Sequence, residues 1–205
     1  MLTTNIQSFY SENPWITVDN FLNSEEIAQI KNSLMTRSLK KSNLMDNSGK
    51  LINAEHRISR ISFISQSETE YEWLFQKILS IADSLNNQFF HYEIYGFDHL
   101  QYSEYDSANH GRYNWHVDAF IGANESQIKN ITSLHRKLSI TILLNDDFEG
   151  GEFQITLDGG MNQTDIPLNE GGLVAFPSFI CHRVSDVVGG IRKSITCWVV
   201  GPKFR

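Results

Sequence analysis

The N-terminal part of the chain alternates a strand-like pattern with a helix-like one. Residues 15–18 form a short apolar run, and apolar positions then recur at helical spacing from Ile27 to Leu34. Asn23 and Glu26 have the spacing of a capping box, in which each side chain bonds the other residue's backbone N–H. We therefore predict a strand, a cap and a first helix.

A second strand and helix follow after a polar stretch. Residues 38–54 are rich in Ser, Asn and Lys and are predicted to be a loop, and residues 56–65 ("HRISRISFIS") alternate well enough for one strand. Residues 67–85 then show a helical apolar face, with Ser67 and Glu70 as the expected capping box. The apolar faces of both helices are predicted to pack on the core.

From Phe89 onward the pattern changes to short β-rich runs separated by Gly, Asn and Asp. Many short strands with this punctuation indicate an antiparallel sandwich or barrel. We expect one domain over residues 1–205, with a helix-rich support over residues 14–88 and a β core over residues 89–203.

Composition narrows the class of protein. The chain has 205 residues, of which 40% are hydrophobic, as in a globular domain with a sizeable core. Seventeen basic and 24 acidic residues give a net charge of -7, which disfavours a nucleic-acid binder. No run approaches the ~18 apolar residues of a membrane span, and no secretion signal is visible at the N-terminus. These features favour a soluble cytoplasmic protein; they do not specify an oligomeric state.

Cys181 and Cys197 are the only cysteines, too few for a disulfide scaffold. If their strand neighbours His182 and Trp198 face the interior of the sandwich, both sulfurs face outward, towards the helices. We predict two buried structural thiols, with a cross-strand bridge as the alternative.

The stretch "YNWHVDAF" at residues 113–120 carries the first candidate site. In a strand, residues two apart share a face, so His116 and Asp118 would aim an imidazole and a carboxylate at one point. Two histidines and one carboxylate are a known ligand set for non-haem Fe(II). A hydrogen-bonded structural pair is the alternative, and His91 and Glu93 in "HYE" have the same spacing.

A second histidine is needed, and His182 stands out among the seven because it lies in the apolar run "FICHRVSD". A core histidine is the alternative. Ten residues later, Arg192 would share a strand face with Ser194, Thr196 and Trp198, looking into the sandwich while the apolar face packs on helices. A buried guanidinium needs an anionic partner, either a protein carboxylate or the carboxylate of a ligand.

These elements together resemble a known family. The order is "HVD" at 116–118, a Glu-Gly-Gly turn at 149–151, a distant histidine, and Arg-x-Ser ten residues after it. Over roughly residues 97–202 this order resembles the prolyl 4-hydroxylase-like branch of the Fe(II)/2-oxoglutarate dioxygenases. The resemblance implies a mainly β double-stranded β-helix (jelly-roll) core, with the N-terminal helices packed on the outer face of one sheet.

The resemblance also implies residue roles. His116, Asp118 and His182 would be the iron ligands and the catalytic residues, and Arg192 the partner of the distal carboxylate of 2-oxoglutarate, supported by Ser194. Further cosubstrate contacts are expected from Tyr105 (with Tyr102 as second choice), Thr141 and Trp198. Many relatives have a tyrosine where this chain has Leu143, so that contact is either absent or made by Thr141.

The implied activity is hydroxylation of an unactivated C–H bond with Fe(II), 2-oxoglutarate and O2, releasing succinate and CO2. The expected substrate is a prolyl or other residue of a peptide or protein; a free amino acid or small metabolite is the alternative. Two other classes are a catalytically silent jelly-roll binding module and an iron enzyme without 2-oxoglutarate, and Arg192 disfavours the latter. Residues 119–137 form either a substrate lid or a solvated insertion.

Overall fold

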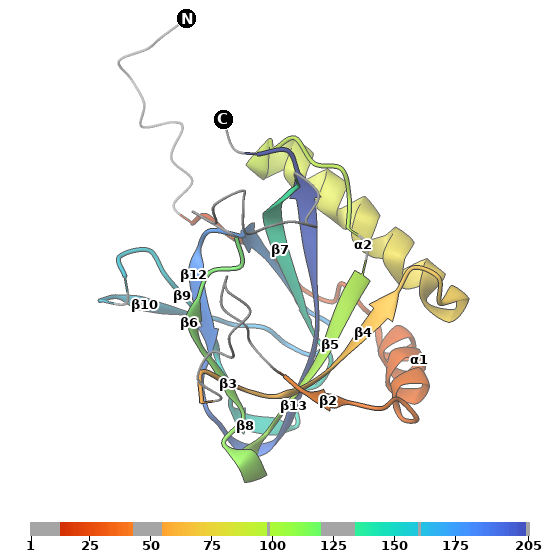
Figure 1. The fold of residues 1–205 in the computed structure, drawn as a ribbon, viewed down its shortest axis with the longest axis vertical. Coiled ribbons are helices and arrows are strands. Elements are labelled where there is room, and N and C mark those ends of the chain that lie inside the picture. Colours follow the sequence, from red (N-terminus) through yellow and green to blue (C-terminus); the bar gives the residue numbers. More distant parts are fainter. Residues whose placement is uncertain (1–12, 43–54, 98, 120–133, 160, 204–205) are drawn as a thin grey trace, which may run out of the picture.

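The computed structural model describes residues 13–42, 55–97, 99–119, 134–159 and 161–203. In this part of the chain two antiparallel sheets face each other, and two helices cover the outer side of the larger one (Figure 1). The predicted jelly-roll architecture with outer helices is confirmed. Most of the expected lid at residues 119–137 and most of the expected loop at residues 38–54 lie outside the described residues; the end of the former, from His135, is strand.

The strands of each sheet come from distant parts of the sequence. In spatial order, the larger sheet contains β1 (Ile16–Val18), β11 (Leu173–Pro177), β7 (His135–Leu143), β13 (Val187–Gly201), β5 (His99–Asp106), β4 (Arg60–Ser65) and β2 (Lys40–Lys41), with β8 (Phe148–Gly150) paired to β13. The smaller sheet contains β10 (Gln163–Ile166), β9 (Phe153–Thr156), β12 (Cys181–Val184), β6 (Arg112–His116) and β3 (Arg57–Ile58).

The first helix, α1 (Ser24–Leu34), begins at the predicted capping box. The Asn23 side chain accepts the Glu26 backbone N–H at 2.9 Å, and the Glu26 carboxylate accepts the Asn23 N–H at 2.8 Å. These bonds satisfy two of the N–H groups that a helix start leaves without a partner. The apolar stripe is buried, as predicted, through Ile27, Ile30 and Leu34.

The second helix, α2 (Glu72–Leu85), begins later than predicted, and the expected box at Ser67 and Glu70 is wrong. A short 3-10 turn, η2 (Thr69–Tyr71), precedes it, and no side chain caps α2. Glu68 accepts the Ser65 N–H at 2.7 Å and pairs with Arg37, so this neighbouring carboxylate stabilises the turn. The apolar face is buried as expected, through Leu74, Ile78, Ala82 and Leu85. No helix in the described ranges is long and apolar enough to cross a membrane.

The single strand predicted at residues 56–65 is two strands. β3 pairs with β6 in the smaller sheet, whereas β4 pairs with β5 in the larger one. The chain changes sheets at Ser59, whose buried hydroxyl donates to Ser42 at 3.1 Å and accepts from Arg57 at 2.9 Å. Alternation continues through such a crossing, so the pattern alone did not reveal it.

The expected β-rich start at Phe89 is also wrong. A π-helical turn, η3 (Asn86–Phe90), extends α2 and ends at His91, which has a φ of 56°. The Asn86 side chain then holds the irregular segment by accepting the Tyr92 N–H at 2.9 Å and donating to its carbonyl at 2.8 Å. Farther on, a short 3-10 turn, η4 (Ser107–Asn109), connects β5 to β6.

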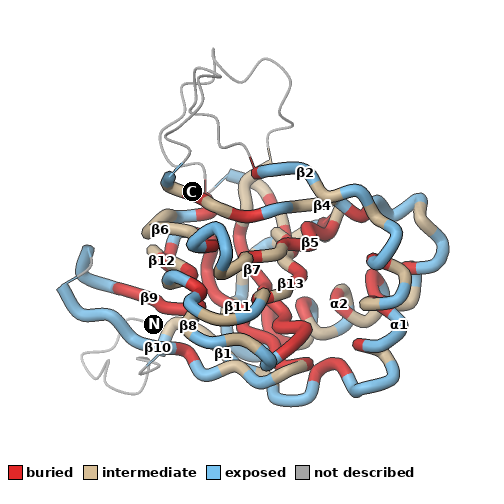
Figure 2. The backbone as a smooth tube through the Cα atoms, turned by 90° about the horizontal axis from the view of Figure 1, so that it is seen from below, coloured by how far each residue is buried: buried red, intermediate tan, exposed pale blue. Residues whose placement is uncertain are grey.

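Two hydrophobic clusters lie on opposite faces of the larger sheet. One lies between the helices and the larger sheet and includes Ile195 and Cys197 of β13; the other, with Phe153 and Phe176, lies between the sheets. Figure 2 shows how much of β7, β11 and β13 is buried. Arg192 and the alternate residues after it on β13 therefore face the smaller sheet, as predicted.

The two cysteines differ, which corrects the prediction for one of them. Cys197 is 1% exposed in the helix-side cluster, but Cys181 is only half-buried because the helices cover the other sheet. Both thiols are free, so the alternative of a bridge is wrong. Burial raises the pKa of both thiols.

We expect a thiol reagent to label Cys181 in the native protein and Cys197 only after unfolding; equal labelling rates of the two would contradict this packing.

Candidate metal centre

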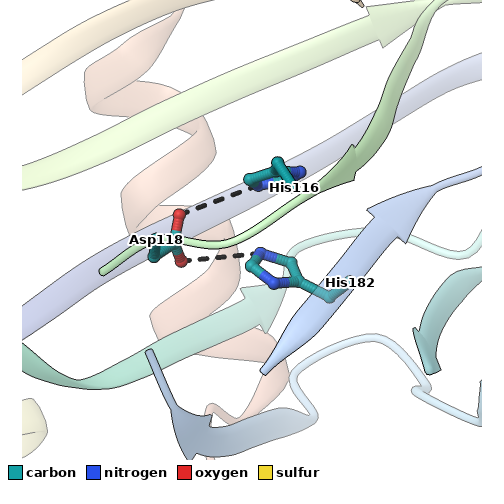
Figure 3. Close-up of side chains that lie close together, drawn as sticks. All are labelled: His116, Asp118 and His182. Carbon is teal, nitrogen blue, oxygen red and sulfur yellow. Dashed lines mark ion pairs between the residues drawn. The ribbon is translucent and has the colours of Figure 1, made fainter. Parts of the chain in front are cut away.

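Three predicted side chains converge between the sheets. His116 at the end of β6 and His182 on β12 are direct partners across neighbouring strands, and Asp118 lies just beyond β6 (Figure 3). The nitrogen Nε2 of His116 lies 3.7 Å from Oδ1 of Asp118, and Nε2 of His182 lies 3.5 Å from Oδ2. All three ligand atoms lie within 4.8 Å of one another.

Asp118 reaches this point differently from the sequence-based expectation. It does not share a strand with His116, because β6 ends at His116 and Asp118 lies in the bend that follows. The backbone N–H groups of Asp118 and Ala119 donate to the carbonyl of Ser178 at 2.9 and 2.8 Å. A turn some sixty residues away in the sequence therefore fixes the carboxylate.

Backbone carbonyls fix the tautomer of both histidines. The Nδ1 atom of His116 lies 2.8 Å from the carbonyl of Asn114, and Nδ1 of His182 lies 2.9 Å from that of Ile180. Since a carbonyl oxygen only accepts, each Nδ1 carries a proton, and in the neutral ring Nε2 then keeps a free lone pair. Both lone pairs are available for a metal beside Asp118.

The protonation states also suit a cation. Burial, reinforced by the neighbouring His182, lowers the pKa of His116 to about 3. Burial would raise the pKa of Asp118, but the two imidazoles, Arg136 and the Ser139 hydroxyl together lower it to about 2. His116 is therefore neutral and Asp118 ionised at neutral pH, as metal ligands must be.

Ser139 supports the carboxylate. Its buried hydroxyl donates to Oδ2 of Asp118 at 2.6 Å and lies 3.0 Å from the hydroxyl of Ser178. Such outer partners orient metal ligands, and their loss typically costs 10–100-fold in metal affinity.

We expect Ser139→Ala to weaken Fe(II) binding by roughly ten- to a hundredfold, measured anaerobically. Ser139→Thr, which retains a hydroxyl, should stay close to the wild type. Equal affinities in the Ala variant and the wild type would show that this hydrogen bond does not orient Asp118.

The rival pair, His91 and Glu93, is not part of this cluster. His91 is exposed in a left-handed backbone conformation, and Glu93 is exposed as well. In the described ranges, His116, Asp118 and His182 are the only group of three or more His, Cys, Asp or Glu ligand atoms close enough to hold one metal ion.

A pocket surrounds the three ligands. It is lined by Arg57, Gln101, Tyr105, Tyr113, His116, Asp118, Thr141, Phe153, His182, Val184, Arg192, Ser194, Thr196 and Trp198.

Arg192 is buried in this pocket without a counter-ion. It is 1% exposed, and its Nε and Nη1 atoms have no hydrogen-bond partner among the residues described. The rings of Tyr105 and Phe148 lie 5.7 and 6.0 Å from its guanidinium carbon. Burial lowers its pKa, as expected for a cation without a neighbouring anion. The alternative raised from the sequence, a protein carboxylate, is not found in the described part of the chain.

The Glu-Gly-Gly turn makes room for this side chain. Gly150 and Gly151 have φ values of 70° and 66°, a conformation that glycine adopts without strain. A Cβ on Gly151 would lie 3.0 Å from Cδ of Arg192. The turn therefore lets the backbone pass close beside the arginine stem.

The other predicted contacts fall mainly in the same pocket. Tyr105, Thr141, Ser194 and Trp198 all line it, and the hydroxyls of Thr141 and Thr196 lie 3.3 Å apart. Tyr102 faces the helix-side cluster and its hydroxyl donates to Glu104 at 2.8 Å. Of the two tyrosines considered from the sequence, Tyr105, the first choice, lines the pocket and Tyr102 does not.

Sequence reasoning missed five residues of the pocket wall: Arg57, Gln101, Tyr113, Phe153 and Val184. The Tyr113 ring stacks on the His116 imidazole with their centroids 3.5 Å apart. The pairing register between β6 and β12 shifts between His182 and Val184, so that Val184 pairs with Tyr113. Simple alternation from His116 does not place Tyr113 beside the imidazole, and only its position in "YNWHVD" hinted at a role.

Comparison with known proteins decides the family. Residues 100–200, which contain the three ligands and Arg192, match the model of the 2OG-Fe(II) oxygenase superfamily. The chain belongs to this superfamily. A PKHD-type hydroxylase of Teredinibacter turnerae is 36% identical to this oxygenase over 93 residues, which cover 44% of this chain and 38% of that protein. The chain spans less than half the length of the curated relatives it matches.

Solved structures agree on the fold of this oxygenase. A Pseudomonas putida prolyl-4-hydroxylase matches with a TM-score of 0.70 at 18% identity, over 93% of this chain and 94% of that one. A prolyl hydroxylase from Trichoplax adhaerens, in complex with a hypoxia inducible factor oxygen degradation domain peptide fragment, matches with a TM-score of 0.69 at 20% identity, over 91% and 83% of the two chains. Both matches show that this oxygenase shares its fold with these prolyl hydroxylases.

The ligand set fits the metal of this superfamily. Two imidazoles and one carboxylate are a ligand set that would hold Fe(II) and leave positions open for a cosubstrate and O2. The triad of His116, Asp118 and His182 is the Fe(II) site of this oxygenase.

Proposed function

We propose that this oxygenase is a hydroxylase that oxidises 2-oxoglutarate together with an unactivated C–H bond. One oxygen atom of O2 enters the substrate as a hydroxyl group and the other enters succinate, while the C1 carboxyl of 2-oxoglutarate leaves as CO2. The observation that carries the proposal is Arg192, a buried cation without a counter-ion in the same pocket as the triad.

The protein's own residues would position the cosubstrate. Arg192 would bind the distal carboxylate with two parallel hydrogen bonds, which suits a planar guanidinium. Ser194 and Thr141 offer hydroxyls in the same pocket, and the Tyr105 ring covers the guanidinium. When bound, Fe(II) supplies the activation of O2. Phe153 and Trp198 would exclude water from the reacting groups.

The substrate we propose is a prolyl or other amino-acid residue of a peptide or protein. The PKHD-type relatives and the two prolyl hydroxylases of similar fold support this choice. A free amino acid or small metabolite is the alternative class. A catalytically silent module is disfavoured, because such a protein would not need to retain both the triad and an unpaired buried Arg192.

Succinate formation tests the proposal. Protein loaded anaerobically with Fe(II) and 2-oxoglutarate is exposed to O2 with proline-containing peptides, other peptides or free amino acids. We expect slow uncoupled succinate release without substrate and a clear increase with one class of substrate. Bound iron and 2-oxoglutarate with no succinate in any arm would overturn the proposal.

A further inference from the structure

A second buried cation faces the same pocket. Arg57 on β3 is 6% exposed, and it lines the pocket together with Arg192 and the triad. Three less buried arginines each form an ion pair with a carboxylate, namely Arg37 with Glu68, Arg60 with Glu104 and Arg112 with Asp186. Neither of the two buried arginines has such a partner among the residues described.

The contacts that Arg57 makes with described residues leave its charge without compensation. Nε donates to the Ser59 hydroxyl at 2.9 Å, and Nη2 donates to the Ser103 hydroxyl at 3.2 Å. The guanidinium also lies over the Tyr113 ring, 4.6 Å from its centroid. A guanidinium has five N–H groups, and within the described ranges only two of them donate, both to neutral hydroxyls. Burial of such a charge is costly unless an anion joins it.

Arg57 is also close to the reacting centre. The Tyr113 ring contacts both the Arg57 guanidinium and the His116 imidazole. Arg57 belongs to the smaller sheet, whereas Ser103 and Arg192 belong to the larger one. A group bound to Arg57 would therefore lie between the sheets, in the pocket that also contains the triad and Arg192.

The charges of the loaded pocket can be balanced. Fe(II) and Arg192 carry three positive charges, and Asp118 and 2-oxoglutarate carry three negative ones. Among the charged groups that line the pocket, these neutralise one another and leave the charge of Arg57. We propose that the substrate itself carries a carboxylate next to the C–H bond that reacts, and that Arg57 binds this carboxylate. This inference rests on the proposed function and names its substrate class.

A purely structural role is the competing explanation, since Arg57 connects the two sheets through Ser103. Ser103→Ala distinguishes the structural role from carboxylate binding, because it removes the hydrogen bond between the sheets and retains the Arg57 guanidinium. Arg57→Gln removes the charge, Arg57→Lys keeps it, and Arg60→Gln is a matched control at an exposed arginine three residues away.

The experiment uses protein loaded with Mn(II) in place of Fe(II) and with 2-oxoglutarate, so that no turnover occurs. Carbon-13-labelled acetate is the probe and acetamide its neutral counterpart, and the paramagnetic relaxation that Mn(II) causes in each is measured by NMR. We expect acetate to be relaxed and acetamide not. The affinity for acetate should fall roughly tenfold or more in Arg57→Gln, as for the loss of a hydrogen bond between charged groups. It should be partly kept in Arg57→Lys and unchanged in Arg60→Gln and Ser103→Ala.

Two further probes separate the sources of the carboxylate. N-acetylglycine presents a terminal carboxylate, as a free acid would, and the α-amide of N-acetylaspartate presents the side chain of an acidic residue in a peptide. Stronger relaxation of one of them identifies the source.

Acetate relaxation that is equal in Arg57→Gln and the wild type, or acetamide relaxation equal to that of acetate, would overturn the inference. If Arg57→Gln does not fold, loss of acetate binding in the folded Ser103→Ala variant would also overturn the inference. The relaxation of labelled 2-oxoglutarate is measured first. Its absence would contradict the proposed function, whereas bound 2-oxoglutarate without bound acetate would contradict only the role of Arg57.

Discussion

Replacing Arg192 is expected to lower the affinity for 2-oxoglutarate roughly tenfold to several hundredfold. A hydrogen bond to a charged group contributes ~1.5–3 kcal/mol, and about 1.4 kcal/mol corresponds to a factor of ten. Arg192→Ala and Arg192→Met should both show this loss, while Fe(II) affinity changes little. Arg192→Lys should recover only part of it, because an ammonium group cannot reproduce the planar fork.

Thermal stability, measured on the same preparations, is the control for Arg192. Arg192→Met keeps the apolar stem and removes a buried charge that no carboxylate in the described part of the chain neutralises. We therefore expect its melting temperature in the absence of 2-oxoglutarate to be no lower than that of the wild type. A clear fall in melting temperature with unchanged 2-oxoglutarate binding would assign Arg192 a structural role instead.

Loss of a triad ligand is the second large effect. His116→Ala, Asp118→Ala and His182→Ala should each weaken Fe(II) binding by more than the roughly 10–100-fold that loss of an outer hydrogen-bond partner causes. His91→Ala and Glu93→Ala are matched controls, since these residues have the same spacing but lie exposed and outside the cluster. Anaerobic Fe(II) titration measures all five variants. Normal binding in His116→Ala together with loss in His91→Ala would reverse the assignment.

Strand alternation predicted the side of the sandwich that each residue of β13 faces. Because Ile195, Cys197 and Val199 are apolar and need cover, Arg192 and Trp198 had to face the smaller sheet. This argument uses one strand only, and it therefore does not depend on knowing which strands pair.

Features that depend on pairing between distant segments could not be predicted in this way. Asp118 is placed by the carbonyl of Ser178 and the hydroxyl of Ser139, and nothing in "HVD" reveals either partner. The sequence assigned Arg57 to one continuous strand over residues 56–65. Its position between the sheets follows from the change of sheet at Ser59, which the sequence pattern does not show. Unlike Arg192, Arg57 became informative only once the pairing of β3 and β4 was known.

The visible absorption of the anaerobic protein with Fe(II) and 2-oxoglutarate tests the assignment of the site most directly. A 2-oxo acid chelated to Fe(II) gives a charge-transfer band that neither component gives alone, and no substrate is needed to observe it. We expect the band in the wild type, its loss in Asp118→Ala, and its return in Arg192→Ala only at much higher 2-oxoglutarate concentrations. A wild-type protein that binds Fe(II) but gives no such band at any 2-oxoglutarate concentration would contradict the assignment of this pocket as an Fe(II)/2-oxoglutarate site.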